Sequence, residues 1–236
     1  MDIDLASLAP SARYKLLTGL VVPRPIALVT TTDPQGRTNA APYSFFNLFS
    51  HDPALVVLGI ERRRFDTSKD TGRNIDLVGE FVVHLVDEEL AEAMAICAVD
   101  FPPEVSEPEI AGLELVPCRR VAPRRILRAP AALECRCLTL MRLGRTRELV
   151  IGEILWVHAR EGLVDPTTLR VDLGRYRPVG RLFGDLYCRI QDIFALPRPA
   201  PSAFAEAITP APAGEDGMRP EGADPAPGAR ERPAGQ

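Results

Sequence analysis

Short hydrophobic stretches rich in β-branched residues, separated by turn-forming residues, dominate the first half of the chain. Residues 26–32 form one such stretch, and the turn-forming sequence Asp33–Gly36 ends it. A second predicted strand runs from Arg37 into the forties, and a third covers the longest apolar run, 54–60. We predict further strands at 81–86 and, as a hairpin around residues 144–148, at 131–143 and 149–159.

The polar segment 61–74 leads into a short predicted helix. Ser68 or Asp70 is placed to cap its start with a side-chain oxygen. Gly79 is placed to end it, because glycine readily adopts the left-handed conformation found after helices.

A second helix is predicted at 88–97, and residues 102–123 are predicted to be irregular apart from a brief strand at 112–116. The strands lie close together in sequence and do not alternate regularly with helices. This organisation favours a mainly β fold, an antiparallel barrel with a few covering helices, over a parallel sheet.

The composition changes near Pro197, after which proline, alanine, glycine and acidic residues dominate. Such a segment buries too little apolar surface to offset the entropy lost on ordering. We therefore predict one folded domain over residues 1–199 and a disordered tail over 200–236.

Charge and composition exclude several classes of function. A net charge of -4 argues against a general nucleic-acid binder. The first residues, M-D-I-D, are acidic where a secretion signal is basic, and no run reaches the ~20 apolar residues of a membrane span. We therefore expect a soluble, cytoplasmic protein that binds neither nucleic acid nor membranes.

The five cysteines indicate neither a disulfide framework nor a metal site. Only Cys135 and Cys137 lie close together, and no paired spacing typical of zinc ligands is present. The sequence also has no dinucleotide-binding glycine motif after a strand, no P-loop, no G-x-S-x-G and no H-E-x-x-H. Rossmann, phosphoryl-transfer, hydrolase and zinc-protease functions thereby lose their main support.

The segment Asn39–Asn47, N-A-A-P-Y-S-F-F-N, combines short side chains with a proline. Because Pro42 has no N–H group, it belongs at the edge or at a bend of a sheet. Backbone groups beyond it, near residues 44–46, are then expected to point outward and to suit a planar ring with alternating donors and acceptors. The alternative is a strand with a proline bulge.

Hydroxyls and a cation gather at the start of the first predicted helix, in Thr67, Ser68, Lys69 and Thr71, after the arginines at 62–64. Free N–H groups and the dipole of a helix start favour an anion there. The alternative is a solvated basic loop with an ordinary cap. Together, a ring-binding edge and a phosphate-binding turn are what flavin mononucleotide (FMN) requires.

The order of several short motifs over residues 20–199 resembles the flavin reductase-like, FMN-binding split-barrel family. That family includes flavoredoxins and the reductase components of two-component flavin monooxygenases. The motifs are V-P-R-P-I-A-L-V-T-T (22–31), N-A-A-P-Y-S-F-F-N (39–47), S-K-D-T-G-R-N-I (68–75), E-F-V-V-H-L (80–85), A-G-L-E (111–114), A-L-E-C-R (132–136), I-G-E-I-L-W-V-H (151–158) and V-G-R-L-F-G-D-L-Y (179–187). His84 stands where asparagine is more often expected, and Phe183 where glycine is frequent.

The resemblance implies an antiparallel, six-stranded split barrel that forms a homodimer, with FMN near the subunit interface. It places the isoalloxazine ring along 39–47 and the phosphate at the start of the helix. The predicted FMN-binding residues are Asn39, Ala40, Ala41, Pro42, Tyr43, Ser44, Phe45, Phe46, Asn47, Arg62, Ser68, Lys69, Asp70, Thr71, Asn74, Arg181 and Tyr187.

Three of the implied roles have structural alternatives. His158 is the candidate catalytic residue, at the face where nicotinamide would stack, and the alternative is a packed strand histidine. Arg181 and Tyr187 match the family's closing pattern and either enclose the flavin or only fix the dimer.

The implied activity is hydride transfer from NAD(P)H to FMN, with a flavin-dependent oxygenase as a candidate partner. The lack of an acid–base pair agrees with this activity, because the cofactor supplies the chemistry and the protein supplies orientation and electrostatics. Two alternatives stay open: an electron-transfer flavoprotein of the same fold, and a non-catalytic FMN-binding or sensor protein.

Overall fold

The computed structural model describes residues 1–63, 67–102 and 105–204. Contacts divide the chain into two units, Met1–Ile193 and Phe194–Gln236. All the elements named below belong to the first unit, and the second contains a 3₁₀ helix at Pro201–Phe204. The prediction of a disordered tail over 200–236 lies almost wholly outside the described residues.

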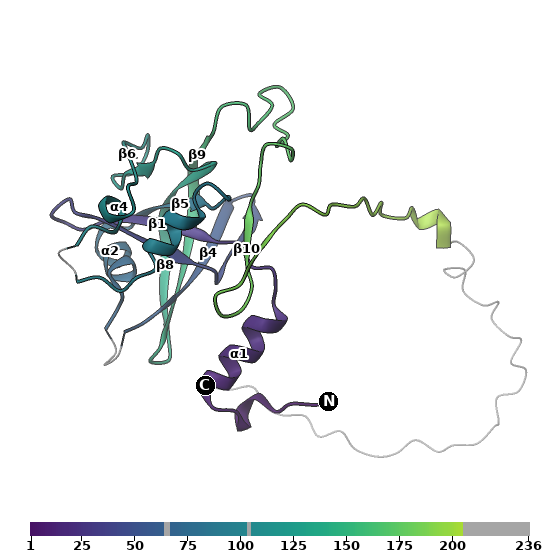
Figure 1. Cartoon of the computed structure of the whole chain (residues 1–236), viewed down its shortest axis with the longest axis horizontal. Helices are drawn as coiled ribbons and strands as arrows, with labels where there is room; N and C mark the ends of the chain where they lie inside the picture. The colour runs from purple at the N-terminus through teal and green to yellow at the C-terminus, as the bar shows by residue number, and fades with distance from the viewer. Residues whose placement is uncertain (64–66, 103–104, 205–236) are drawn as a thin grey trace, which may run out of the picture. The chain divides into compact units, whose positions relative to one another are not determined.

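The main sheet is antiparallel and runs in the order β2-β1-β5-β8-β9-β4-β3 (Figure 1). Its strands are β1 (Ala27–Thr32), β2 (Thr38–Tyr43), β3 (Phe46–His51), β4 (Ala54–Glu61), β5 (Glu80–Leu85), β8 (Ala131–Leu143) and β9 (Arg147–Ala159). Two small pairs accompany it, β6 (Leu115–Val116) with β7 (Arg125–Ile126), and β10 (Val179–Arg181) with β11 (Tyr187–Arg189). The helices are a 3₁₀ turn at Leu5–Ser7, α1 (Pro10–Leu20), α2 (Asp70–Val78), α3 (Ala91–Ile96) and α4 (Glu107–Ile110).

The mainly β, antiparallel class predicted from the sequence is confirmed, with a seventh strand, β3, beside the six expected. After β2 the chain turns at Ser44 and pairs with β4, where the N–H of Gly59 donates to the carbonyl of Phe45 at 2.7 Å. The expectation that the backbone near Phe45 points outward is therefore wrong. The pattern did not reveal β3 because most of its side chains are exposed and no alternation is visible.

Pro42 lies at an edge of the sheet, as predicted. Strand β2 pairs only with β1 in this sheet, and Pro42 is opposite Leu28. Ala40, two residues earlier, directs its N–H away from β1 to a carboxylate of α4. Residues two apart on a strand share an orientation, so the nitrogen of Pro42 also points away from β1. The missing N–H of Pro42 therefore removes no hydrogen bond between β1 and β2.

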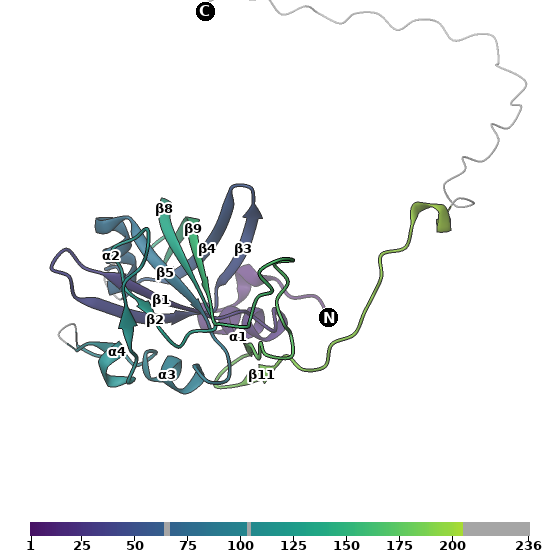
Figure 2. The same ribbon diagram turned by 90° about the horizontal axis from the view of Figure 1, so that it is seen from above.

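Two hydrophobic clusters lie on opposite faces of β1 and β2. One contains Val29, Tyr43, Leu58, Ile75 and Phe81, so α2 contributes Ile75 to the interior between β1 and β4. The other packs α3 and Ala111, the residue after α4, against Leu28 of β1 and Ala40 of β2. Figure 2 shows α3 and α4 together on one side of these strands and α2 on the other.

Helix α2 begins at Asp70, and the capping of its first turn differs from the prediction. Lys69 is the N-cap residue, and no side chain caps the first turn. Ser68 does not cap because its hydroxyl donates instead to Glu148 of β9. Gly79 ends the helix as predicted, with φ of 76°, a left-handed conformation that favours glycine.

Other boundaries shift by a few residues. Helix α3 is shorter than the predicted 88–97, and β9 begins at Arg147, which shortens the hairpin turn. The brief strand expected within 112–116 is present as β6. Helix α1 was not predicted, because its apolar residues do not form a single stripe and several are exposed. No helix in the described ranges is long and apolar enough to cross a membrane.

His84 on β5 is fully buried and joins three strands. Its Nδ1 hydrogen-bonds to the carbonyl of Leu28 on β1 at 2.8 Å, and its Nε2 lies 2.9 Å from the donating N–H of Ile126 on β7. Because Nε2 accepts, the proton of the neutral ring is on Nδ1. Burial lowers the pKa of His84 to about 4, which keeps the ring neutral.

Candidate functional site

The two segments singled out in the sequence lie against each other at the β2 edge. Asn39 of β2 donates from Nδ2 to Oγ1 of Thr71 on α2 at 3.0 Å. A cavity of about 100 Å³ lies between β2, the start of α2 and the residues after α3. The predicted site residues that line it are Asn39, Ala41, Pro42, Tyr43, Lys69, Asp70 and Thr71.

The start of α2 presents groups that favour an anion. Lys69 lines the cavity, and its ammonium has no hydrogen-bond or ion-pair partner within the described part of the chain. The unpaired N–H groups of the first helical turn add partial positive charge. The carboxylate of Asp70 pairs with Arg63 at 2.8 Å and with Arg73 at 2.9 Å, so its negative charge is offset.

Polar side chains next to this cavity are deeply buried. The hydroxyl of Tyr43 is buried without a hydrogen-bond partner among the described residues, and burial raises the pKa of Tyr43, so the phenol keeps its proton. Asn74 donates from Nδ2 to Oγ1 of Thr31 at 3.1 Å. Asn74 therefore packs against β1 and does not line the cavity at Lys69; it borders a smaller recess nearby.

Glu107 of α4 closes the outer edge of β2. Its Oε2 accepts a hydrogen bond from the N–H of Ala40 at 3.3 Å. Burial raises the pKa of the Glu107 carboxyl. The backbone donor of Ala40 is thus used within the protein, and a ligand at this edge meets Asn39, Ala41 and Pro42 instead.

Ser44 is held by the buried guanidinium of Arg24, which joins three segments. Arg24 Nε donates to Oγ of Ser44 at 3.3 Å. Its Nη1 donates to the carbonyls of Thr18 and Val21, at 2.6 and 2.8 Å, at the end of α1. Its Nη2 donates to the carbonyl of Leu182, in the β10–β11 loop, at 2.5 Å. The position of Ser44 is therefore set together with those of α1 and this loop.

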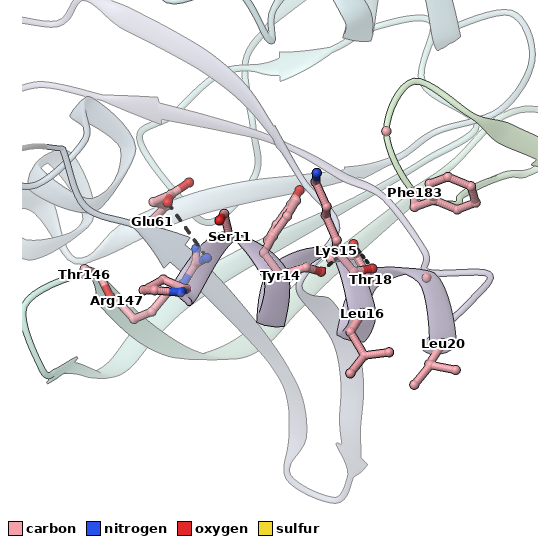
Figure 3. Close-up of a pocket in the computed structure, with 13 residues that line it drawn as sticks. Ser11, Tyr14, Lys15, Leu16, Thr18, Leu20, Glu61, Thr146, Arg147 and Phe183 are labelled. Carbon is pink, nitrogen blue, oxygen red and sulfur yellow. Dashed lines mark hydrogen bonds and ion pairs between the residues drawn. The ribbon is translucent and has the colours of Figure 1, made fainter. Parts of the chain in front are cut away.

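A larger pocket, about 1040 Å³, lies between α1, the ends of β4 and β9, and the β10–β11 loop (Figure 3). Tyr14 and Lys15 of α1 lie between Arg147 and Phe183 in this view. The ring of Phe45 lies 6.5 Å from that of Tyr14, and Arg147 Cζ lies 5.1 Å from the Phe45 ring centroid. Through Phe45, the predicted ring-binding segment borders this pocket.

The remaining predicted FMN residues of these two segments are more scattered. Phe46 packs against the barrel interior, and exposed Asn47 accepts the N–H of Leu48 at 2.8 Å. Arg62 and Ser68 lie together under the start of α2, where both contact Glu148.

Arg181 and Tyr187 are opposite each other in the β10–β11 pair. The guanidinium of Arg181 hydrogen-bonds to the Tyr187 hydroxyl and to the carbonyl of Gly184, and its Cζ lies 4.5 Å from the Tyr187 ring centroid. Arg181 also exchanges two backbone hydrogen bonds with Arg24. The predicted pair therefore shapes the loop that borders the larger pocket.

His158 lies apart from both cavities. Its Nε2 is 2.5 Å from Oε1 of Glu134, a fully buried carboxylate on β8. Burial acts to raise the pKa of Glu134, but hydrogen bonds from the N–H of Arg119, from His158 and from the N–H of Arg120 hold it below its ordinary value. The described structure gives His158 a carboxylate partner and no contact with the predicted flavin residues.

Sequence reasoning missed Glu148, Arg24 and α1. The V-P-R-P motif contains Arg24, but nothing local indicates that its partners lie in α1 and near Leu182. Pro10, which suits the first turn of a helix, was the one available signal for α1. Within the described ranges, no group of three His, Cys, Asp or Glu side chains is arranged to hold a metal ion.

Comparison with known proteins identifies the family of this chain. The model of the flavin reductase like domain matches residues 19–180, well over half of the chain. The chain belongs to the flavin reductase-like family. The resemblance inferred from the short motifs is thereby confirmed.

Three solved structures resemble most of the chain. The 2-nitrobenzoate 2-nitroreductase NbaA of Pseudomonas fluorescens is 41% identical, covers 84% of this chain and 96% of its own, and has a TM-score of 0.78. Nitrilotriacetate monooxygenase component B of Bacillus cereus is 32% identical, covers 83% and 98%, and has a TM-score of 0.80. A putative flavin reductase with a split barrel domain from Shewanella frigidimarina, 22% identical with a TM-score of 0.73 and covering 84% and 100%, has the same fold. The split-barrel class is therefore confirmed.

Proposed function

We propose that this flavin reductase-like protein binds FMN and transfers a hydride to it from NAD(P)H. The observation that carries the proposal is the meeting of the β2 edge and the start of α2 at one cavity, joined by the Asn39–Thr71 hydrogen bond. It unites a surface of short residues with an anion-favouring helix start.

The residues present fit FMN. Lys69, an unpaired cation within the described residues, and the free N–H groups of α2 would hold the phosphate. Asn39, Ala41 and Pro42 offer a flat edge for the ring system, and Ser44 is fixed by Arg24 beside it. When bound, FMN supplies the two-electron chemistry, and the protein orients it and excludes water.

We place the nicotinamide in the larger pocket, because this pocket borders Phe45 and offers the aromatic rings of Tyr14 and Phe183. Arg181 and Tyr187 would then act by shaping its wall. A catalytic role for His158 remains our proposal. It requires a second subunit, because within one chain His158 lies against Glu134.

A second candidate is a reductase with an aromatic acceptor of its own. The volume and aromatic lining of the larger pocket, with Lys15 at its border, favour it, and NbaA is named for a nitroaromatic acid. The likeness to nitrilotriacetate monooxygenase component B supports instead the delivery of reduced flavin to a partner oxygenase. Electron transfer from another protein, and non-catalytic FMN binding, are the further alternatives.

One set of measurements separates these functions. We expect the purified protein to be yellow, to release FMN rather than FAD on denaturation, and to oxidise NADH or NADPH. Each nucleotide is assayed with oxygen, ferricyanide or 2-nitrobenzoate as the acceptor. If the protein binds FMN but oxidises neither nucleotide, the remaining functions are electron transfer from another protein and non-catalytic FMN binding. Failure to take up added flavin would overturn the proposal.

A further inference from the structure

Glu148 on β9 is a carboxylate without access to solvent directly beneath the polar segment that precedes α2. Its Oε1 accepts a hydrogen bond from Ser68 Oγ at 2.5 Å. The same oxygen lies 3.4 Å from Nε of Arg62. One buried carboxylate thus contacts two of the residues predicted to bind FMN.

The first turn of α2 lies unusually close to this carboxylate. A Cβ atom on Gly72 would be 2.2 Å from Glu148 Oε2, so only glycine allows the helix to approach this far. Within the described residues, Oε2 has no hydrogen-bond partner. A buried carboxylate with an unsatisfied oxygen costs stability, so its presence points to a role in the site above it.

The hydrogen-bond inventory separates the residues that support the turn from those free to bind a ligand. A serine hydroxyl has one hydrogen, and a carboxylate only accepts. Because Ser68 donates to Glu148, its hydroxyl has no hydrogen left for a phosphate. Arg62 Nε forms an ion pair with the same carboxylate at 3.4 Å, without a hydrogen bond. Lys69 and the free N–H groups of α2 are available to an anion at this cavity, which Arg63, paired with Asp70, also lines.

We propose that Glu148 is a positioning residue for the phosphate-binding turn. Its contacts with Ser68 and Arg62 fix the segment before α2. Lys69 and the first N–H groups of α2 are thereby directed at the phosphate of FMN. The proposal rests on the proposed FMN function and names the residue that organises its phosphate site. The guanidinium of Arg62 offsets the charge of the carboxylate, which limits its repulsion of the phosphate.

The test compares FMN with riboflavin, which lacks the phosphate, on the flavin-free full chain by fluorescence titration. We expect Glu148→Gln to weaken FMN binding about tenfold and riboflavin binding by less than about twofold. Tighter FMN binding would show that Glu148 acts only as a nearby negative charge. Equal weakening of both ligands would show a purely structural role. Either result, or an unchanged FMN affinity, overturns the proposal.

Two further variants keep the test decisive. Gly72→Ala displaces the carboxylate with its charge intact and should cause the same selective loss of FMN. Glu153→Gln, on the same strand, removes a 2.6 Å surface ion pair with Arg136 and should leave the FMN-to-riboflavin affinity ratio unchanged. If Glu148→Gln does not fold, the FMN-to-riboflavin affinity ratio of Gly72→Ala tests the proposal in its place.

The wild type separates the two proposals. If it binds FMN more tightly than riboflavin while both variants keep that preference, the role of Glu148 is overturned and the proposed function stands. If the wild type has no preference for FMN, the phosphate site fails, and the role of Glu148 fails with it.

Discussion

Lys69 is one of only two lysines in the chain, and it stands unpaired, within the described residues, at the start of α2. Lys69→Ala should remove a charge-assisted contact with the FMN phosphate, worth ~1.5–3 kcal/mol, or roughly ten- to a hundredfold in affinity. Riboflavin affinity should hardly change. Titration of both flavins into wild type and variant measures the difference.

Lys15 supplies the matched control, since Lys15→Ala removes the other lysine, at the border of the larger pocket. Its FMN-to-riboflavin affinity ratio should equal that of the wild type. If Lys69→Ala instead weakens both flavins equally, or neither, the anion is held elsewhere and the arginines around 62–64 become the first candidates.

His84 predicts a loss of stability in acid. Its pKa is lowered by burial to about 4 in the folded protein, against about 6.5 in an unfolded chain. Between these values the unfolded state binds more protons, so the free energy of unfolding decreases as the pH falls from about 6.5 to about 4. The full effect is ~3 kcal/mol below that window.

The variant His84→Gln isolates this contribution, because glutamine can donate and accept but does not titrate. Urea unfolding at several pH values should show a smaller loss from pH 7 to pH 4.5 in the variant than in the wild type. The variant should also be less stable at pH 7, where the bonds of His84 to Leu28 and Ile126 are intact. Parallel pH profiles would assign the acid sensitivity to other groups.

At the scale of elements, Arg24 is the joint between α1, the β2–β3 turn and the β10–β11 loop. Arg24→Ala leaves the carbonyls of Thr18, Val21 and Leu182 without this donor. We expect faster hydrogen exchange in α1 and a loss of stability of ~2–4 kcal/mol. Hydrogen exchange by mass spectrometry and urea unfolding measure both.

Arg24→Lys keeps the charge but not the forked geometry that reaches three segments at once. It should therefore recover only part of the stability. Full recovery by lysine would mean that the charge matters and the fork does not, and unchanged exchange in α1 would mean that α1 is held by other contacts.

Across the first unit, large apolar side chains are exposed on α1, β3 and the β10–β11 loop. Leu20 is 69% exposed, Phe49 is 67% exposed and Phe183 is 54% exposed. Exposed apolar side chains on three elements offer apolar area for a second subunit to bury. They support the proposed homodimer, in which a second subunit covers them.

Light scattering should therefore give twice the chain mass at micromolar concentration. Phe49→Asp, which introduces a charge into an interface, should yield monomers and weaken flavin binding if FMN lies near the partner. An exposed control, Leu169→Asp, should leave the mass unchanged. A wild-type monomer would contradict the proposed dimer.

Several features of the fold were determined locally and could be read from the sequence. The continuous apolar run 54–60 predicted a strand, and every second side chain of β4 (Val56, Leu58 and Ile60) is buried in the interior. Pro42 required an edge because it lacks an N–H group, and Gly79 marked the end of α2 because that position needs a positive φ. The same local rules predicted a ring-binding edge and an anion-favouring helix start, and the tertiary structure places these two segments side by side.

Only the tertiary structure decided which residues within these segments are free to bind a ligand. Local capping rules predicted that Ser68 or Asp70 caps α2, yet the hydroxyl of Ser68 donates to Glu148, eighty positions along the chain. Ser44 depends on Arg24, which in turn bonds Leu182, 158 positions away. A side chain's hydrogen-bonding capacity is limited, and a distant partner uses it up without any trace in the neighbouring sequence. The groups that can bind a ligand at a site are therefore those that the fold leaves without a partner.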